Sequence, residues 1–95
     1  MDREQLEKGA QLFSALANPQ RLEIMLVLAE SIETELSLSE LQAKMGGMAQ
    51  SSLSTYVTQL RIARLVVVRR EARWVRIRIA DSSLIDHIKA LAERG

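Results

Sequence analysis

Residues 50–60 read QSSLSTYVTQL, and the flanking elements of the fold can be interpreted from this stretch outward. Leu53, Val57 and Leu60 recur at a spacing of four and then three residues, which is the pattern of one buried helix face. We expect this helix to run from about Gln50 to Arg64. Its opposite face carries short hydroxyl and amide side chains, where a solvent-facing helix usually carries Glu, Lys and Arg. Small neutral groups are poorer helix formers, so their presence on an exposed face needs a reason.

The flanking segments supply that reason. Upstream, SLSELQAKM (residues 37–45) predicts a short helix with Ser39 as its N-cap, and Gly46 and Gly47 predict a tight turn. Downstream, residues 65–80 contain two β-branched runs separated by a turn at EAR, which predicts a hairpin. A short helix, a turn, a second helix and a basic hairpin form the layout of a winged helix-turn-helix. The second helix of such a pair enters the DNA major groove.

The first third of the chain predicts two further helices. Residues 3–17 form an amphipathic stripe, and Asn18 followed by Pro19 is the pattern of an N-cap and first helical position. The next helix reads RLEIMLVLA over residues 21–29, and because it is apolar nearly all round we expect it to be buried. Residues 30–36 are then expected to form an acidic connection.

The end of the chain predicts one more helix. Asp81 or Ser82 is expected to cap an apolar-striped helix over about residues 82–94. The expected order is therefore four helices, a two-stranded hairpin and a last helix. These elements form one mainly α winged-helix domain over residues 1–95, a size that buries a modest core and that dimerisation could supplement.

Charge and composition limit the classes of function. Residues 1–40 hold eight acids and three bases, whereas residues 41–80 hold eight bases and one acid, Glu71. Such segregation favours a half that faces a polyanion, the alternative being a solvated basic surface. Cysteine is absent, which excludes disulfides and thiolate metal sites. No apolar run approaches the length of a membrane span and the first residues do not resemble a signal peptide, so we expect a cytoplasmic protein.

The residues expected to contact double-stranded DNA come from the second helix and the hairpin. Hydroxyls and amides can approach phosphates and base edges closely, while arginines can meet a phosphate strand or enter the minor groove. The predicted set is Gln50, Ser51, Ser54, Thr55, Thr58, Gln59 and Arg61 on the helix, with Arg69, Arg70 and Arg73 on the hairpin.

Three segments of the chain together resemble one family, the ArsR/SmtB-type bacterial repressors. LFSALANPQRLEIMLVLAE (12–30) is similar to the family's opening signature, GMAQSSLSTYVTQLRIARLV (47–66) to its recognition helix, and VRREARWVRIRI (68–79) to its wing. The resemblance implies a homodimeric repressor whose first and last helices form the dimer interface, with Arg21 in a structural role. The interface residues we expect are Leu6, Phe13, Leu84, Ile88 and Leu91.

The chain also departs from the family pattern. Many relatives carry Arg at Thr55, so the preferred operator sequence should differ. They carry Gly at Arg64 and Ala72, so the helix exit and the wing turn are less permissive here. Metal-sensing relatives carry Cys-x-Cys where this chain has Ser37 and Ser39, and serine hydroxyls are poor ligands for soft metals.

No metal site, cofactor or catalytic site is therefore expected. Asp86 and His87 are adjacent and would point about 100° apart on a helix, and the chain lacks a Gly-x-Ser-x-Gly motif. Two alternatives stay open: a metal sensor whose oxygen and nitrogen ligands come from these two residues or from the acids of residues 30–40, and a protein-interaction module on a winged-helix scaffold. Nothing in the sequence identifies an inducer. The favoured interpretation is a homodimeric repressor of an inverted-repeat operator.

Overall fold

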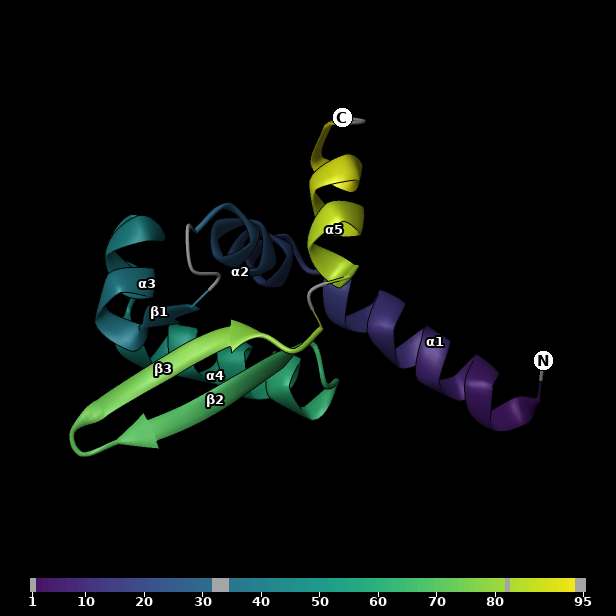
Figure 1. Ribbon diagram of the computed structural model, residues 1–95, viewed down its shortest axis with the longest axis horizontal. Coiled ribbons are helices and arrows are strands. Elements are labelled where there is room, and N and C mark those ends of the chain that lie inside the picture. The colour runs from purple at the N-terminus through teal and green to yellow at the C-terminus, as the bar shows by residue number, and fades with distance from the viewer. Residues whose placement is uncertain (1, 32–34, 82, 94–95) are drawn as a thin grey trace.

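The computed structural model describes residues 2–31, 35–81 and 83–93, and the elements follow the expected order with one strand added. Four helices precede the hairpin and one follows it (Figure 1). The elements are α1 (Arg3–Leu16), α2 (Pro19–Glu30), β1 (Glu35–Ser37), α3 (Leu38–Lys44), α4 (Gln50–Ile62), β2 (Val66–Glu71), β3 (Trp74–Ile79) and α5 (Ser83–Glu93).

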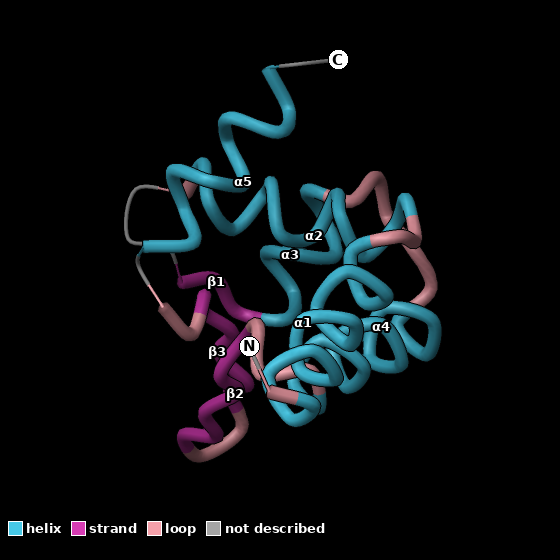
Figure 2. The backbone as a smooth tube through the Cα atoms, turned by 90° about the vertical axis from the view of Figure 1, so that its right-hand side faces the viewer, coloured by secondary structure: helices cyan, strands magenta, loops and turns pink. Residues whose placement is uncertain are grey.

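Helix α2 is the centre of the core, as its all-round apolar sequence predicts. Ile24, Met25 and Leu28 of this helix are fully buried. Leu53 of α4 and Ile77 of β3 are fully buried in the same cluster. Figure 2 shows the sheet at one edge of the helices, with the hairpin projecting beyond them. Helix α4 therefore packs against the core by one face, and its other face is exposed.

The junction between α1 and α2 forms as predicted. The Asn18 side chain accepts a hydrogen bond of 3.0 Å from the backbone N–H of Arg21, and Pro19 occupies the first turn of α2. Helix α1 buries only Ala15 and extends away from the body (Figure 1). Its remaining length is thus open to contact with another molecule.

The sheet contains a third strand that the sequence analysis missed. Strand order is β1-β3-β2 and both pairings are antiparallel, with Leu36 opposite Ile77. The expectation that residues 30–36 form only an acidic connection is wrong for Glu35 and Leu36, which lie in β1. A three-residue strand has no periodicity of its own; the free edge of β3 and the burial of Leu36 stabilise it.

The N-cap of α3 is Ser37 rather than the predicted Ser39. The Ser37 hydroxyl accepts a hydrogen bond of 3.1 Å from the Glu40 backbone N–H, and the Glu40 carboxylate accepts one of 2.9 Å from the Ser37 N–H. This capping box needs an acid or amide side chain three residues after the cap, and Ser37 has Glu40 at that place. Hydrogen bonds from the Ser37 backbone and side chain lower the pKa of Glu40.

Helix α4 ends at Ile62, two residues before the predicted end. Arg64 and Ala72, at the helix exit and the wing turn, adopt left-handed backbone angles of φ +63° and +51°. These are the two positions where relatives are expected to carry glycine, so the chain keeps the turns despite its larger residues.

Asp81 lies just before α5 and contacts its first residue. The Asp81 carboxylate accepts hydrogen bonds of 2.9 Å from both the backbone N–H and the hydroxyl of Ser83, which lower its pKa. Ser82, the alternative cap, lies outside the described residues. Within the described ranges, every helix is too short or too polar to cross a bilayer.

Candidate nucleic-acid interface

The two faces of α4 divide as the sequence predicts. Leu53, Val57 and Leu60 are buried, whereas Ser51 and Thr55 are exposed on the other side. The Thr55 hydroxyl donates a hydrogen bond of 3.0 Å to the Ser51 carbonyl one turn earlier. Because its only hydrogen is used in this way, the Thr55 hydroxyl can serve a further partner only as an acceptor.

A groove of about 590 Å³ separates the outer part of α4 from the hairpin; we call it the interface groove. Five of the predicted contact residues line it, four on α4 and one on β2. They are Gln50, Ser54, Thr58, Arg61 and Arg70. The other lining residues are the apolar Leu38, Val57, Val68 and Val75. The groove thus combines small polar groups with two cations, and none of its described lining residues is an acid.

The two faces of the hairpin separate Arg70 from Arg69. Arg70 lies opposite Val75 on the sheet face that packs toward α4, whereas Arg69 lies opposite Arg76 on the other face. Two ion pairs hold Arg69 there, 3.1 Å to Glu35 and 3.0 Å to Glu71. The structure therefore brings Arg70 into the groove and does not bring Arg69 there.

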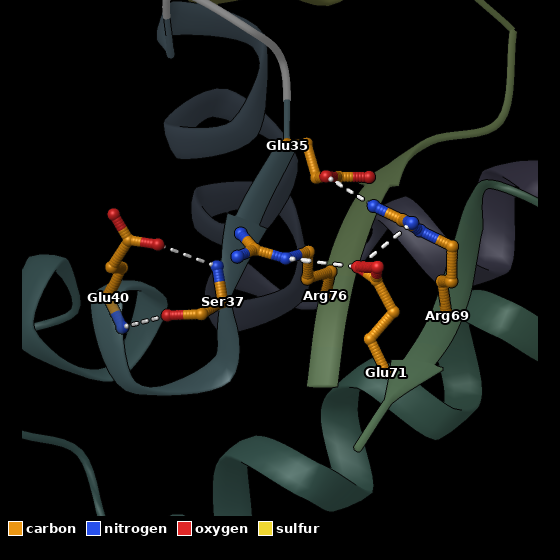
Figure 3. A network of polar contacts seen from close by, with 6 residues as sticks. All are labelled: Glu35, Ser37, Glu40, Arg69, Glu71 and Arg76. Carbon is orange, nitrogen blue, oxygen red and sulfur yellow. Dashed lines mark hydrogen bonds and ion pairs between the residues drawn. The ribbon is translucent and has the colours of Figure 1, made fainter. Parts of the chain in front are cut away.

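The outer face of the sheet carries a small network of ion pairs. Glu71 contacts Arg69 and also Arg76, at 3.7 Å, while Glu35 extends the network to β1 (Figure 3). Successive residues of a strand point to opposite faces, so Arg70 shares a face with buried Val66 and partly buried Val68, and Arg69 lies on the other face. Sequence reasoning grouped the arginines and overlooked this signal.

Arg73 lies in the wing turn, next to the entrance of the interface groove. With Gln50 and Trp74 it lines a smaller hollow of about 190 Å³ that also reaches Ser37 and Ser39 near the start of α3. Because Gln50 lines both spaces, the positive charge of Arg73 adjoins the groove.

Gln59 points to a different neighbour from the other predicted contact residues. Its side-chain oxygen accepts a hydrogen bond of 2.7 Å from the guanidinium of Arg21. Arg21 also donates to the carbonyls of Ala15 and Ser14, at 2.7 and 3.2 Å, near the end of α1. The structural role expected of Arg21 is confirmed, whereas Gln59 lies away from the interface groove.

The predicted dimer-interface residues fall into three groups. Leu6 and Phe13 of α1 are 55% and 79% exposed, which is unusual for large apolar side chains. Ile88 of α5 is 2% exposed and belongs to the core of its own subunit, so its placement at the interface is wrong. The α5 stripe packs against α2 and the core by this side, which sequence alone does not reveal. The side chains of Leu84 and Leu91 lie outside what the structure describes.

Metal ligation finds no support among the described residues, which contain no cluster of three His, Asp or Glu side chains. Asp86 and His87 are both exposed on α5.

Known proteins share this architecture over nearly the whole chain. No protein-family model matches it. The chain is 36% identical to a transcriptional repressor SmtB homolog of Synechocystis sp., over 98% of this chain and 67% of that protein. It is 34% identical to the transcriptional activator HlyU of Vibrio cholerae, over 90% of this chain and 72% of that protein.

Solved structures agree with these sequence relatives. The structure of Vibrio cholerae HlyU matches with a TM-score of 0.82 and 31% identity, over 98% of this chain and 96% of that one. The homodimeric winged helix-turn-helix DNA-binding domain of Mb0332 from Mycobacterium bovis, described as a possible ArsR-family regulator, matches with a TM-score of 0.81 and 28% identity, over 98% and 87%. The chain thus belongs to the ArsR/SmtB-type winged-helix transcriptional regulators, a DNA-binding and non-enzymatic family.

Proposed function

We propose that the chain binds an inverted-repeat operator as a homodimer, with α4 in the major groove and the wing along the flanking phosphates. The interface groove supports this proposal, because hydroxyl and amide side chains of the kind that can read bases line it together with two cations. Ser54 and Thr58 line this groove together with Arg61 and Arg70, and their hydroxyls would reach base edges there.

The outward-facing groups of α4 support direct reading of bases. Ser51 and Thr55 are short, so they let the helix come close to the duplex. With its hydrogen donated to the Ser51 carbonyl, the Thr55 hydroxyl would accept from an amino group of adenine or cytosine, or its methyl would pack on a thymine methyl.

The exposed apolar side chains of α1 support a dimer. Leu6 and Phe13 would be covered by a second copy of the chain, with Leu84 and Leu91 of α5 in the same interface. The Mycobacterium bovis domain with the same fold is homodimeric, which supports this arrangement. In this proposal residues 1–95 act as one domain, with dimerisation helices at about 3–17 and 82–94.

Repression by occlusion is the proposed outcome of binding. The Synechocystis relative is a repressor and the Vibrio relative an activator, so the family name alone does not fix the direction. A dimer with recognition helices in successive major grooves, about 34 Å apart, would cover promoter DNA and exclude polymerase. Such a regulator would act in the cytoplasm, where its operator lies.

Selection of bound duplexes from a random pool at physiological salt tests the proposal. We expect an inverted repeat with half-site centres about one helical turn apart. If promoter fragments and random duplexes bind equally weakly, the proposed function is wrong, and the basic surface serves another partner.

Matched variants assign roles within the interface. Ser54→Ala removes a groove hydroxyl and should change which sequences are selected, whereas Ser52→Ala removes an exposed hydroxyl of the same helix outside the groove and should not. Thr55→Ala should also shift the selected sequence. Arg73→Ala should weaken all duplexes about equally, because a wing arginine contacts phosphate and not base.

A further inference from the structure

Arg21 is a cation whose contacts are all with neutral groups. Its guanidinium donates to two backbone carbonyls and to the side-chain oxygen of Gln59, at distances of 2.7 to 3.2 Å. Among the described residues, no carboxylate lies within ion-pair distance of it. A carboxylate forms shorter and stronger hydrogen bonds with guanidinium than an amide oxygen does, and it can bind in a bidentate manner. Arg21 is therefore able to take a better acceptor than Gln59.

Space for such an acceptor lies directly beside this contact. Two adjoining hollows of about 350 and 360 Å³ run between α1 and the end of α4, and we call them together the α1–α4 groove. Arg21 and Gln59 line the first hollow, and Lys8 and Arg64 line the second. Among the described residues no acid lines either hollow, although Lys8 pairs with exposed Glu4 at 3.2 Å.

Part of the wall of the α1–α4 groove is apolar. Ile62 and Ala63 line both hollows, and Leu12 lines the second. Ile62, the last residue of the recognition helix, is a large aliphatic side chain that is 68% exposed. A cation beside an exposed aliphatic surface fits a small molecule that has one anionic group and one apolar body.

The α1–α4 groove is separate from the surface proposed for dimerisation. At 100° per residue, Phe13 lies about 140–160° around α1 from Lys8, Gln11 and Ala15, which line the groove. Leu12 and Ser14, which also line it, lie about 100° from Phe13. Most of the groove-lining positions of α1 therefore face away from a partner seated on Phe13. The groove can stay open in the dimer.

We propose that the α1–α4 groove is a regulatory site for a small organic carboxylate. The carboxylate binds the Arg21 guanidinium in place of the Gln59 oxygen, and its apolar body covers Ile62 and Ala63. The Arg21–Gln59 hydrogen bond joins the first turn of α2 to the recognition helix across 38 positions of the sequence, and the same guanidinium also holds the end of α1 through the carbonyls of Ser14 and Ala15. Its loss frees α4 to change its angle relative to the dimerisation helix, which lowers operator affinity. This second step depends on the DNA-binding function proposed above.

Octanoate is the probe for the site, with octan-1-ol as the uncharged control of equal chain length. In ¹⁵N-labelled protein free of DNA, octanoate should produce saturable amide shifts centred on Gln11, Arg21, Gln59 and Ala63. Octan-1-ol should not saturate at these residues. Absence of saturable shifts, or equal binding of the alcohol, would overturn the anion site.

Two substitutions of the exposed Ile62 provide a matched pair. Ile62→Glu places a negative charge against the incoming carboxylate and should weaken octanoate binding by at least about tenfold. Ile62→Gln has a similar size without the charge and should keep most of the affinity. Thermal unfolding of both variants checks that they fold. If the two variants bind octanoate equally, the assignment to this groove is wrong.

Operator binding provides the regulatory readout. Saturating octanoate should weaken the wild-type complex by about 5- to 150-fold, the usual range of coupling between two sites, and should leave Ile62→Glu unaffected whatever its starting affinity. Octanoate binding without any effect on the operator complex would refute the coupling. If octanoate binds but no operator can be selected, the proposed function fails and the site stands. If an operator is bound but octanoate is not, the proposed function stands and the regulatory site is wrong.

Discussion

Replacement of Arg70 by alanine tests whether the wing holds DNA through the interface groove. Arg70 lines this groove together with Arg61 of the recognition helix. Arg69, one residue earlier, lies on the opposite face of the sheet in ion pairs with Glu35 and Glu71. The two neighbours have the same chemistry and different surroundings, so they form a matched pair.

The size of the effect follows from counterion release. Each phosphate contact contributes about 0.9 to the slope of log affinity against log salt concentration, and a dimer has two copies of Arg70. Arg70→Ala should therefore reduce the slope by about 1.8. The ratio of the wild-type operator affinity to the Arg70→Ala affinity should therefore fall about 12-fold between 50 and 200 mM salt.

Fluorescence anisotropy of a labelled operator at several salt concentrations measures both slopes. Arg69→Ala should change the slope by less than half as much, because two carboxylates already neutralise its guanidinium. A slope that falls as much for Arg69→Ala as for Arg70→Ala would show that the wing meets DNA by its other face. The assignment of the groove would then be wrong.

Three further predictions concern stability and assembly. Arg64→Gly and Ala72→Gly should each raise the free energy of unfolding in denaturant by about 0.5–1 kcal/mol, because both residues have positive φ. Ala63→Gly, at φ −76°, is the control and should not raise it. Because the pKa of Glu40 is lowered in the folded protein, its carboxylate stabilises the fold above the ordinary pKa of 4.5, and this stabilisation is lost as the pH falls through the lower folded value. The melting temperature of Glu40→Gln, measured between pH 6 and 3, should lack this loss. A variant whose melting temperature falls with pH as much as that of the wild type would contradict the prediction. Phe13→Asp should convert the dimer to a folded monomer in sedimentation experiments, since the side chain is 79% exposed in the single subunit; a persisting dimer would place the interface elsewhere.

Local interactions explain which parts of the fold the sequence predicts correctly. The spacing of Leu53, Val57 and Leu60 predicts the buried side of α4, and therefore also the exposed side that carries Ser51 and Thr55. The same holds for the cap and first turn of α2 and for the alternating strand β3, because neighbours within four residues decide helix and strand.

Contacts between distant residues explain what the sequence alone leaves undetermined. Strand β1 exists because Leu36 meets Ile77, and Gln59 turns to Arg21 because packing sets α4 against α2. Ile88 is directed into its own subunit by α2 and not toward a partner. Periodicity shows that a side chain belongs to an apolar or polar face; only the packed chain decides what that face meets, because segments that do not adjoin in sequence supply the partner.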